Sequence, residues 1–394
     1  MSKFLMVLTD MDMGGITVAA TNLCNELCDY GHKVDMLVLG ESDQQAKEKF
    51  NDNVSFLELK GFARFWNLKY DFIRREKNIL KKLVLLTLGI IKKIANRKSR
   101  WNQIVFRKKT VYSGYDVVIA YRQCAPCYYF ALNCVEASKK IAFVHGDLNY
   151  MGDISTWRKY MCEFDSVAYV SENIRIGFED KYPDLKGKGI VVRNIFDKEF
   201  IRSKALEHIK FTWPENKIRI VTVSRIENET KAIYRVPQIA KLLIDKYGKC
   251  FYWCVIGDGI SLDECNRKVK EMHLEECLNF LGKKDNPYPW IYQSDFSVLP
   301  SYTEAFPMVV CESLILGVPV VVARYPAVAE QFTIGKNGLV AEQNVESILT
   351  CIGDLIENPE KLKNMRGVAR EYNYDNYESI YQLVKVLDDE NKKA

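Results

Sequence analysis

Residues 301–319, S-Y-T-E-A-F-P-M-V-V-C-E-S-L-I-L-G-V-P, are the stretch on which the fold assignment depends. They follow an apolar run at 296–300 that is typical of a buried strand, and they continue into a helical pattern. Glu304 and Glu312 are eight positions apart, so Glu304 is expected in the strand-to-helix loop and Glu312 inside the helix, roughly on the same side. Pro307 is expected in the first helical turn, where a missing N–H costs nothing. The stretch therefore predicts a strand–loop–helix unit that carries two carboxylates.

Glu312 is the unusual residue of this unit, because it is charged and the other members of its helix are apolar. One interpretation is that it pairs with a basic neighbour, since unpaired buried carboxylates are rare. The other is that a positioned carboxylate recognises the hydroxyl groups of a ligand. The free N–H groups of the first helical turn would face the same ligand, and this setting favours the second interpretation.

The same alternation of strands and helices extends over the whole chain. Continuous apolar strands between helices predict parallel sheets that are covered on both faces. The pattern indicates two Rossmann-like domains, with the junction between about 194 and 212 and with ligands bound at the carboxyl ends of the strands. The expected strands are 4–9, 32–39, 54–59, 115–121, 141–147, 166–171 and 189–194 in the first domain, and 218–223, 251–256, 278–281, 296–299 and 319–323 in the second.

Length and composition agree with this organisation. A chain of 394 residues suggests two domains or a little more. Twelve Cys without the spacing of a disulfide framework indicate a reducing compartment. No stretch approaches the ~20 apolar residues that cross a bilayer. We therefore expect a cytoplasmic protein that is soluble or peripheral to the membrane.

The charge is unevenly distributed. The chain has a net charge of +5, but residues 60–109 contain sixteen Lys and Arg against Asp71 and Glu76, a local balance of +14. Such segregation predicts an anionic partner for one face of the protein.

Several residues after strands of the second domain are candidates for ligand binding. Arg225 and Lys231 follow the first strand and precede a helix, which suits a diphosphate, although two solvated cations on a loop are an alternative. Gly257 opens a Gly-Asp-Gly turn that would approach a nucleotide closely. The stretch Asn286-Pro-Tyr-Pro, which contains Tyr288, shapes a base pocket or is simply a proline-rich turn.

The first domain offers weaker candidates. Gly14 and Gly15 allow a turn that brings the backbone close to a ligand. His145 lies at a strand end, where a functional histidine and a buried structural histidine are both common. Asp10 and Asp12 form a D-x-D pattern, but a divalent cation needs more carboxylates than these. No metal site is expected.

Taken in order, these motifs resemble one family. R-x5-K, G-D-G, N-P-Y-P-W-I, S-Y-T-E-A-F-P-x4-E, L-G-V-P-V-V and G-K-N-G-L-V are similar to the motifs of the retaining glycosyltransferases of family 4. Members with N-P-Y-P resemble bacterial enzymes that build capsular and other surface polysaccharides. The resemblance covers nearly all of residues 1–394, is dense in 218–342 and is weakest at 60–114.

The resemblance implies a GT-B fold, in which two Rossmann-like domains have parallel sheets facing a central cleft. It implies that residues 1–200 form the acceptor-side domain and residues 201–375 the donor-binding domain. Residues 376–394 would form a helix that packs back on the first domain. The donor substrate would be a nucleotide sugar, with a UDP-hexose expected, and no other cofactor is implied.

The resemblance also implies roles for individual residues. Arg225 and Lys231 would bind the diphosphate, and Glu312 would hold the ribose hydroxyls. Glu304 would hold the donor sugar together with the backbone N–H groups on either side of Pro307, those of Phe306 and Met308. The expected catalytic residues are Glu304, His145, Arg225 and Lys231, and the expected donor-binding residues are Gly14, Gly15, Arg225, Lys231, Gly257, Tyr288, Phe306, Pro307, Met308 and Glu312.

In this scheme His145 would contact the donor sugar near the reacting centre, and Gly14 and Gly15 would approach the phosphates. Two departures from the family pattern stand out: Ala305 occupies a position that is more often Gly, and the spacing between Arg225 and Lys231 is one residue longer than usual.

The function expected from these features is transfer of a hexose from a nucleotide sugar to a lipid-linked saccharide at the cytoplasmic face of the membrane. A nucleotide-sugar epimerase shares the fold but would need acid/base carboxylates and no acceptor. A nucleic-acid-binding protein is the third class. It is disfavoured because a phosphate-tracking groove has aromatics between its charges, whereas the middle of the basic segment is aliphatic.

The basic segment at 60–110 is instead expected to contact an anionic membrane surface. Lysine pairs at 81–82 and 92–93 bracket an apolar block, and Trp66 and Trp101 flank it as interfacial anchors do. The alternative is a helix whose apolar side packs on the first domain. The apolar stripe that either interpretation requires recurs at helical spacing and consists of Ile79, Leu83, Leu86, Ile90 and Ile94.

Overall fold

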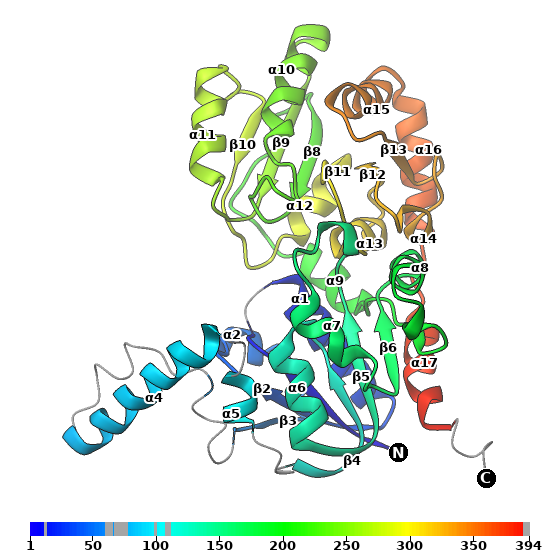
Figure 1. Cartoon of the computed structure of the whole chain (residues 1–394). Helices are drawn as coiled ribbons and strands as arrows, with labels where there is room; N and C mark the ends of the chain where they lie inside the picture. Colours follow the sequence, from blue (N-terminus) through cyan, green and yellow to red (C-terminus); the bar gives the residue numbers. More distant parts are fainter. Residues whose placement is uncertain (12–13, 60–65, 67–77, 98–100, 107–111, 389–394) are drawn as a thin grey trace. The chain divides into compact units, whose positions relative to one another are not determined.

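The computed structural model describes residues 1–11, 14–59, 66, 78–97, 101–106 and 112–388. The chain forms two compact units (Figure 1): Met1–Ile195 with Asn376–Ala394, and Phe196–Asp375. The predicted boundary at 200–201 falls inside α9 (Lys198–Ala205), which belongs to the second unit. The chain enters this unit at Phe196, and Asp197 begins α9 by accepting a hydrogen bond from the Phe200 N–H.

The first unit contains a seven-stranded sheet with the strand order β3-β2-β1-β4-β5-β6-β7. Every strand pair in it is parallel. The middle strands are almost wholly buried, as continuous apolar segments predict. The strands are β1 (Lys3–Leu8), β2 (Lys33–Val38), β3 (Val54–Leu57), β4 (Tyr112–Ala120), β5 (Val135–Val144), β6 (Ser166–Tyr169) and β7 (Gly189–Val191).

Helices alternate with these strands. The C-terminal helix α17 (Tyr377–Asp388) belongs to this unit and contacts β5 and β7. The other helices of eight or more residues are α1 (Gly15–Asp29), α4 (Ile79–Arg97), α6 (Ala125–Cys134) and α8 (Glu172–Lys181). The shorter ones are α2 (Gln44–Lys47), α5 (Trp101–Val105) and α7 (Ser155–Met161). Among the described residues, no helix is both long enough and apolar enough to span a bilayer.

The second unit contains a six-stranded parallel sheet with the order β10-β9-β8-β11-β12-β13. β8 and β11 are neighbours at its centre, so the loops that follow them begin side by side. The strands are β8 (Ile218–Val223), β9 (Phe251–Ile256), β10 (Leu278–Phe280), β11 (Phe296–Leu299), β12 (Val320–Ala323) and β13 (Gly338–Ala341). β13 is not among the strands expected from the sequence, although its first three residues, 338–340, belong to the quoted G-K-N-G-L-V motif.

The helices of the second unit pack on this sheet, and α13 contacts β11 and β12. Trp253, Phe251 and Phe296 are fully buried in the core between the sheet and its helices. The remaining helices are α10 (Arg235–Tyr247), α11 (Leu262–Glu271), α12 (Tyr288–Gln293), α13 (Met308–Ile315), α14 (Val328–Gln331), α15 (Val345–Glu357) and α16 (Pro359–Arg370).

Candidate functional site

The candidate site lies at the carboxyl ends of β8 and β11. The loop after β8 contains Arg225 and Lys231, and the loop after β11 contains Glu304. The two loops are joined by backbone hydrogen bonds, because the N–H groups of Tyr302 and Thr303 donate to the carbonyl oxygen of Thr230 at 2.8 and 3.4 Å. Two sequence-predicted groups that are far apart along the chain are therefore brought together by neighbouring strands.

Lys231 and Glu304 form an ion pair across these loops. The Lys231 Nζ atom is 2.7 Å from Oε1 of Glu304, and the hydroxyl of Ser301 donates to the same oxygen at 2.7 Å. The side chains are only 19% and 9% exposed, so solvent screens this pair less than a surface pair. Lys231, the residue predicted to bind the diphosphate, thus contacts Glu304, the residue predicted to hold the donor sugar.

Glu227 organises the loop that carries Lys231, and sequence analysis missed it. Its carboxylate accepts hydrogen bonds from the hydroxyl and the N–H of Thr230 and from the N–H of Lys231. Burial by itself would raise the pKa of Glu227, but these hydrogen bonds outweigh burial and lower it. The sequence offered no capping signal for this role, because Glu227 lies three positions before Thr230, the reverse of the S/T-x-x-E order of a capping box.

Arg225 differs from Lys231 in its surroundings. Its side chain is exposed, and within the described part of the chain it makes no hydrogen bond or ion pair. Its positive charge helps to lower the pKa of Glu227. Arg225 is therefore a cation at a strand end that is available to a ligand without breaking an existing contact.

Glu312 lies on α13, inside the helix as predicted. Burial raises the pKa of its carboxyl to about 7, although the hydroxyl of Tyr288 donates to Oε1 at 3.2 Å and opposes this shift. No ion pair of Glu312 is found among the residues that the structure describes, so pairing with a basic neighbour does not explain it. The structure instead joins Glu312 to Tyr288, the tyrosine of the N-P-Y-P turn.

The start of α13 corrects the prediction for Pro307. Pro307 precedes the helix as its N-cap with an extended backbone (φ −64°, ψ 123°), and Met308 is the first helical residue. The fixed φ of proline suits both positions, so the sequence could not separate them. The side-chain amide of Gln331 donates to the Pro307 carbonyl at 3.0 Å and fixes this helix end. Phe306 is buried, and Met308 is partly exposed.

The Gly257 turn has an explanation within the protein. Gly257 has φ +146°, and an added Cβ atom would lie 1.8 Å from the carbonyl oxygen of Ser224. Glycine is therefore required for the contact between the loops after β8 and β9, whatever the ligand. Its approach to a nucleotide stays a prediction.

The N-P-Y-P turn is tied to the end of α9 and to the residues just after it. The side-chain amide of Asn286 donates to the carbonyl oxygen of Lys204 and to the carboxylate of Glu207, both at 2.8 Å. Its Oδ1 atom accepts a hydrogen bond from the N–H of Tyr288. The asparagine thus fixes the turn that presents Tyr288 to Glu312.

His145 lies just after β5 in the first unit. Its Nε2 atom is 2.8 Å from the carbonyl oxygen of Tyr121, and its ring contacts those of Tyr121 and Phe143. A carbonyl oxygen only accepts, so Nε2 carries the proton. Burial lowers the pKa of His145 to about 4. At neutral pH the imidazole is uncharged, and its Nδ1 atom is a hydrogen-bond acceptor.

Gly14 and Gly15 lie at the start of α1. Gly14 is the N-cap with an extended backbone, and neither glycine has a positive φ. A Cβ atom on Gly15 would meet no other atom within 4 Å, so the fold itself does not require glycine there. Of the D-x-D pattern, Asp10 accepts a hydrogen bond from the Glu41 N–H, whereas Asp12 lies outside the described residues.

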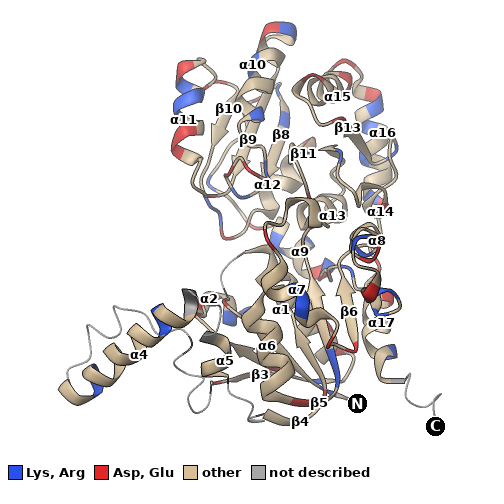
Figure 2. Cartoon of the chain, viewed as in Figure 1, with Lys and Arg blue, Asp and Glu red and all other residues tan. Residues whose placement is uncertain are grey.

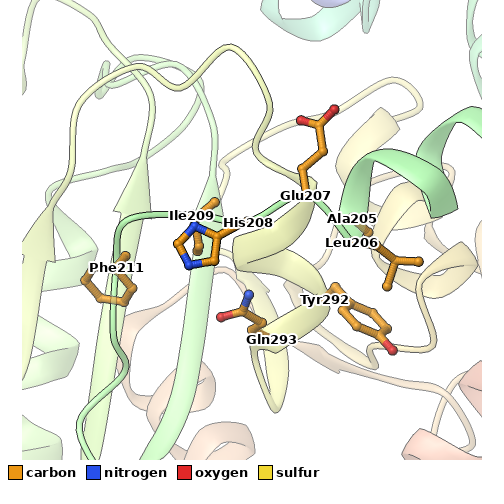
Figure 3. A pocket seen from close by; sticks show the side chains of 8 residues that line it. All are labelled: Ala205, Leu206, Glu207, His208, Ile209, Phe211, Tyr292 and Gln293. Carbon is orange, nitrogen blue, oxygen red and sulfur yellow. The ribbon is translucent and has the colours of Figure 1, made fainter.

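A separate surface pocket lies elsewhere on the second unit (Figure 3). Its volume is about 340 Å³, and it is lined by Ala205, Leu206, Glu207, His208, Ile209, Phe211, Tyr292 and Gln293. The carbonyl oxygen of Gln293 is 3.5 Å from a guanidinium nitrogen of Arg219, near the start of β8. The pocket is therefore near the amino end of β8, and it contains none of the predicted site residues.

Two curated relatives share sequence with parts of the chain. The N-acetyl-alpha-D-glucosaminyl L-malate synthase of Bacillus anthracis is 26% identical over 214 residues, 51% of this chain and 55% of that protein. The N-acetylgalactosamine-N,N'-diacetylbacillosaminyl-diphospho-undecaprenol 4-alpha-N-acetylgalactosaminyltransferase of Campylobacter jejuni is 28% identical over 182 residues, 46% of this chain and 47% of that protein. The matched segments thus span about half the length of these relatives.

Solved structures resemble the chain over almost its full length. TarM of S. aureus, in complex with Fondaparinux, alpha-GlcNAc-glycerol and UDP, has a TM-score of 0.70 at 14% identity and covers 98% of this chain and 100% of its own. Alr3699/HepE of Anabaena, in complex with UDP and glucose, has a TM-score of 0.68 at 16% identity, with coverage of 99% and 100%. At these identities the likeness establishes the fold alone.

The two parallel sheets with this strand order define a GT-B fold, as the sequence motifs predicted. Residues 203–372, nearly all of the second unit, match the family model described as glycosyl transferases group 1. This match is confined to the second unit, and it contains Arg225, Lys231, Glu304 and Glu312.

Proposed function

We propose that the chain is a retaining, metal-independent glycosyltransferase that moves a hexose from a nucleotide sugar, expected to be UDP-linked, to a lipid-linked saccharide in surface-polysaccharide synthesis. The observation that carries the proposal is that one unit contains the Lys231–Glu304 ion pair, the Tyr288–Glu312 hydrogen bond and the exposed Arg225. The Campylobacter jejuni relative is named as a transferase that acts on a diphospho-undecaprenol saccharide. The two solved neighbours contain UDP.

The proposed chemistry follows from the charges of the second unit. When the bond between the anomeric carbon and the phosphate oxygen breaks, negative charge develops on the leaving diphosphate. Arg225 and Lys231 stabilise this negative charge, and the positive N-terminal end of α13 stabilises it further. Glu304 accepts hydrogen bonds from the sugar hydroxyls, and Glu312 accepts them from the ribose.

Retention of configuration is proposed to occur by a front-face route. The acceptor hydroxyl attacks the anomeric carbon on the side from which the diphosphate leaves, and the leaving phosphate oxygen takes the hydroxyl proton. In the neutral form found here, His145 offers Nδ1 as an acceptor for a donor-sugar hydroxyl. It contributes no positive charge at neutral pH.

The first experiment is a panel of nucleotide sugars, assayed for thermal stabilisation and for slow hydrolysis by the purified protein. The true donor stabilises the native state by RT ln(1 + [L]/Kd) and should stand out from the panel. Released hexose supports a transferase, whereas an epimerised nucleotide sugar supports the epimerase alternative. A panel in which no nucleotide or nucleotide sugar stabilises the protein would overturn the proposal.

A second part of the proposal is that α4 attaches the protein to an anionic membrane at the cytoplasmic face. All five members of the predicted apolar stripe are exposed, with Ile79 at 75%, Ile90 at 61% and Ile94 at 57%. This exposure, seen among the described residues, supports membrane contact over the alternative in which the stripe packs on the first domain. The buried residues of the helix are instead Leu85 and Ala95.

The charges of α4 fit an acidic lipid surface. The helix contains Lys81, Lys82, Lys92, Lys93 and Arg97 and no acidic residue, and Figure 2 shows basic positions at both ends. Each basic residue near such a surface contributes about 1 kcal/mol. The predicted role of Trp66 as an anchor is not supported, because its indole N–H donates to Asn102 and its ring stacks on Phe106. The side chain of Trp101 lies outside the described residues.

Sedimentation with liposomes tests this second part. Binding to vesicles that contain acidic lipid should weaken as salt rises and should be lost when Lys81, Lys82, Lys92 and Lys93 are changed to Glu. A matched control changes four exposed lysines elsewhere, Lys186, Lys241, Lys249 and Lys363, to Glu. Equal loss in both variants would indicate a general charge effect, and retained binding in the α4 variant would show that α4 is not the contact.

A further inference from the structure

The loop that carries Glu304 is held at three consecutive carbonyl oxygens by two side chains. A guanidinium nitrogen of Arg235, Nη1, donates to the carbonyl of Pro300 at 2.9 Å. The side-chain amide of Gln343 donates to the carbonyls of Ser301 and Tyr302, both at 3.1 Å. The three carbonyls belong to residues 300–302, and Glu304 follows two positions later.

Arg235 and Gln343 also hold each other. Arg235 donates through Nη1 to Oε1 of Gln343 at 3.0 Å and through Nη2 to its backbone carbonyl at 2.8 Å. The Arg235 guanidinium lies 4.2 Å from the centre of the Tyr302 ring, a cation–π distance. Arg235 is only 7% exposed, so these contacts form in a setting where solvent competes weakly.

The two side chains come from different parts of the sheet. Arg235 is the first residue of α10, and Gln343 follows β13 and also donates to the carbonyl of Arg324, after β12, at 2.6 Å. The network therefore connects the ends of β11, β12 and β13 with the helix that follows β8. On its other side, the same loop is fixed by the hydrogen bond from the Tyr302 N–H to Thr230.

The geometry of this loop sets the geometry of the ion pair. Ser301, whose carbonyl Gln343 holds, donates its hydroxyl to the Glu304 oxygen that also contacts Lys231. Neither Arg235 nor Gln343 has a side-chain contact with Glu304, Lys231 or Glu312 in the hydrogen bonds described. The hydrogen bonds by which these two residues reach the loop are made to the backbone carbonyls of 300–302.

We propose that Arg235 and Gln343 are positioning residues that fix Glu304 for recognition of the donor sugar. The inference rests on the proposed function, in which Glu304 holds that sugar. A displacement of about 1 Å at a reacting centre can cost on the order of 100-fold in rate, so small movements of this loop should be visible in kcat.

The test compares Gln343→Met and Arg235→Lys with the unmodified protein. Met keeps the length of the side chain without its amide, and Lys keeps the charge of Arg235 without its forked donors. The matched control is Arg324→Ala, because Arg324 lies at the same edge and its side chain pairs only with Glu342 among the described residues. The readouts are the affinities for UDP and for the UDP-sugar, kcat, KM and the melting temperature.

We expect both positioning variants to bind UDP within about twofold of the unmodified protein and to lose the extra affinity that the sugar provides. The kcat value should fall by on the order of tenfold to 100-fold, whereas Arg324→Ala should leave all readouts unchanged. In a Glu304→Ala background, Gln343→Met should cause no further loss, because residues that act as one unit are not additive.

Three results would overturn the inference: unchanged kcat in both variants, an equal further loss in the Glu304→Ala background, or a parallel fall in UDP affinity and melting temperature. The last would show that the network only stabilises the unit. Failure of the unmodified protein to bind any nucleotide is a different outcome, because it overturns the proposed function and the inference with it.

Discussion

The two sheets have the same strand order, yet their carboxyl ends have different chemistry. In each unit the first strand lies in the middle, the second and third follow on one side, and the later strands follow on the other. The second unit places charged residues at these ends, with Lys231 paired to Glu304 and Arg225 exposed. The first unit places His145 there as a neutral imidazole, and the loop after its first strand leads into helix α1, which begins at glycine. The repeated topology gives both sheets a similar carboxyl-terminal edge. The residues in the loops that follow the strands make the edge of the second unit suitable for a diphosphate.

The two units also differ in how a buried titratable group responds to pH, because the pKa shifts of Glu312 and His145 have opposite signs. Burial raises the pKa of Glu312 in the second unit and lowers that of His145 in the first. In both cases burial favours the uncharged form. Each edge thus contains a group that is kept neutral over part of the physiological range.

The largest expected effect is that of Arg225→Ala. It should lower transfer at least 100-fold, the scale of one removed charge-stabilising donor, with an unchanged melting temperature because the side chain is exposed. Arg324→Ala, which removes an exposed arginine from the same unit, serves as the control in a radiolabelled-donor assay. Near-normal turnover of Arg225→Ala would show that the charged edge does not bind the diphosphate.

Glu312→Gln should change the pH dependence of stability. The pKa of Glu312 is about 7 in the folded state against a usual value of 4.5. Its contribution to the free energy of unfolding is therefore complete below pH 4.5 and is lost as pH rises towards 7. The loss in the free energy of unfolding is up to about 3 kcal/mol. Urea unfolding at pH 5 and pH 8 should show that the stability of Gln relative to Glu is clearly larger at pH 8 than at pH 5. An equal difference at both pH values would contradict the raised pKa.

His145→Gln should show the opposite sign. The folded pKa of about 4 lies below the usual 6.5, so the stabilising contribution of His145 is complete above pH 6.5 and is lost as pH falls towards 4. The free energy of unfolding of the unmodified protein should decline relative to the variant between pH 7 and pH 5, again by about 3 kcal/mol or less. A constant difference over this range would mean that the imidazole is not held neutral by burial.

The smallest effect is expected from a chelator. Transfer should survive EDTA, because Arg225, Lys231 and the N-terminus of α13 provide the positive charge that a metal ion would supply. The measurement is initial rate before and after dialysis against EDTA, with added manganese as the control. Complete loss of activity that manganese restores would instead make Asp10 and Asp12 a metal site.

The sequence by itself determined the class of fold and placed most of the second unit's candidate site residues on their elements. Apolar strands alternating with helices required parallel sheets, and the spacing of Glu304 and Glu312 placed one carboxylate in a loop and the other in a helix. The spacing also identified an apolar stripe on α4, but only the structure showed that the stripe is exposed. Periodicity defines a face of a helix and leaves open what covers it.

Tertiary structure alone decided which charged groups meet. Lys231 and Glu304 are 73 positions apart, and Arg235 and Gln343 are 108 apart. They come together because β8 lies beside β11 and because β12 and β13 follow on the same side. The partner of Glu312 was decided in the same way, since Tyr288 can donate to it only because α12, which Tyr288 begins, contacts α13. The local sequence pattern predicts the helix, strand or loop in which each residue lies. The order of the strands in the sheet determines which distant residues it contacts.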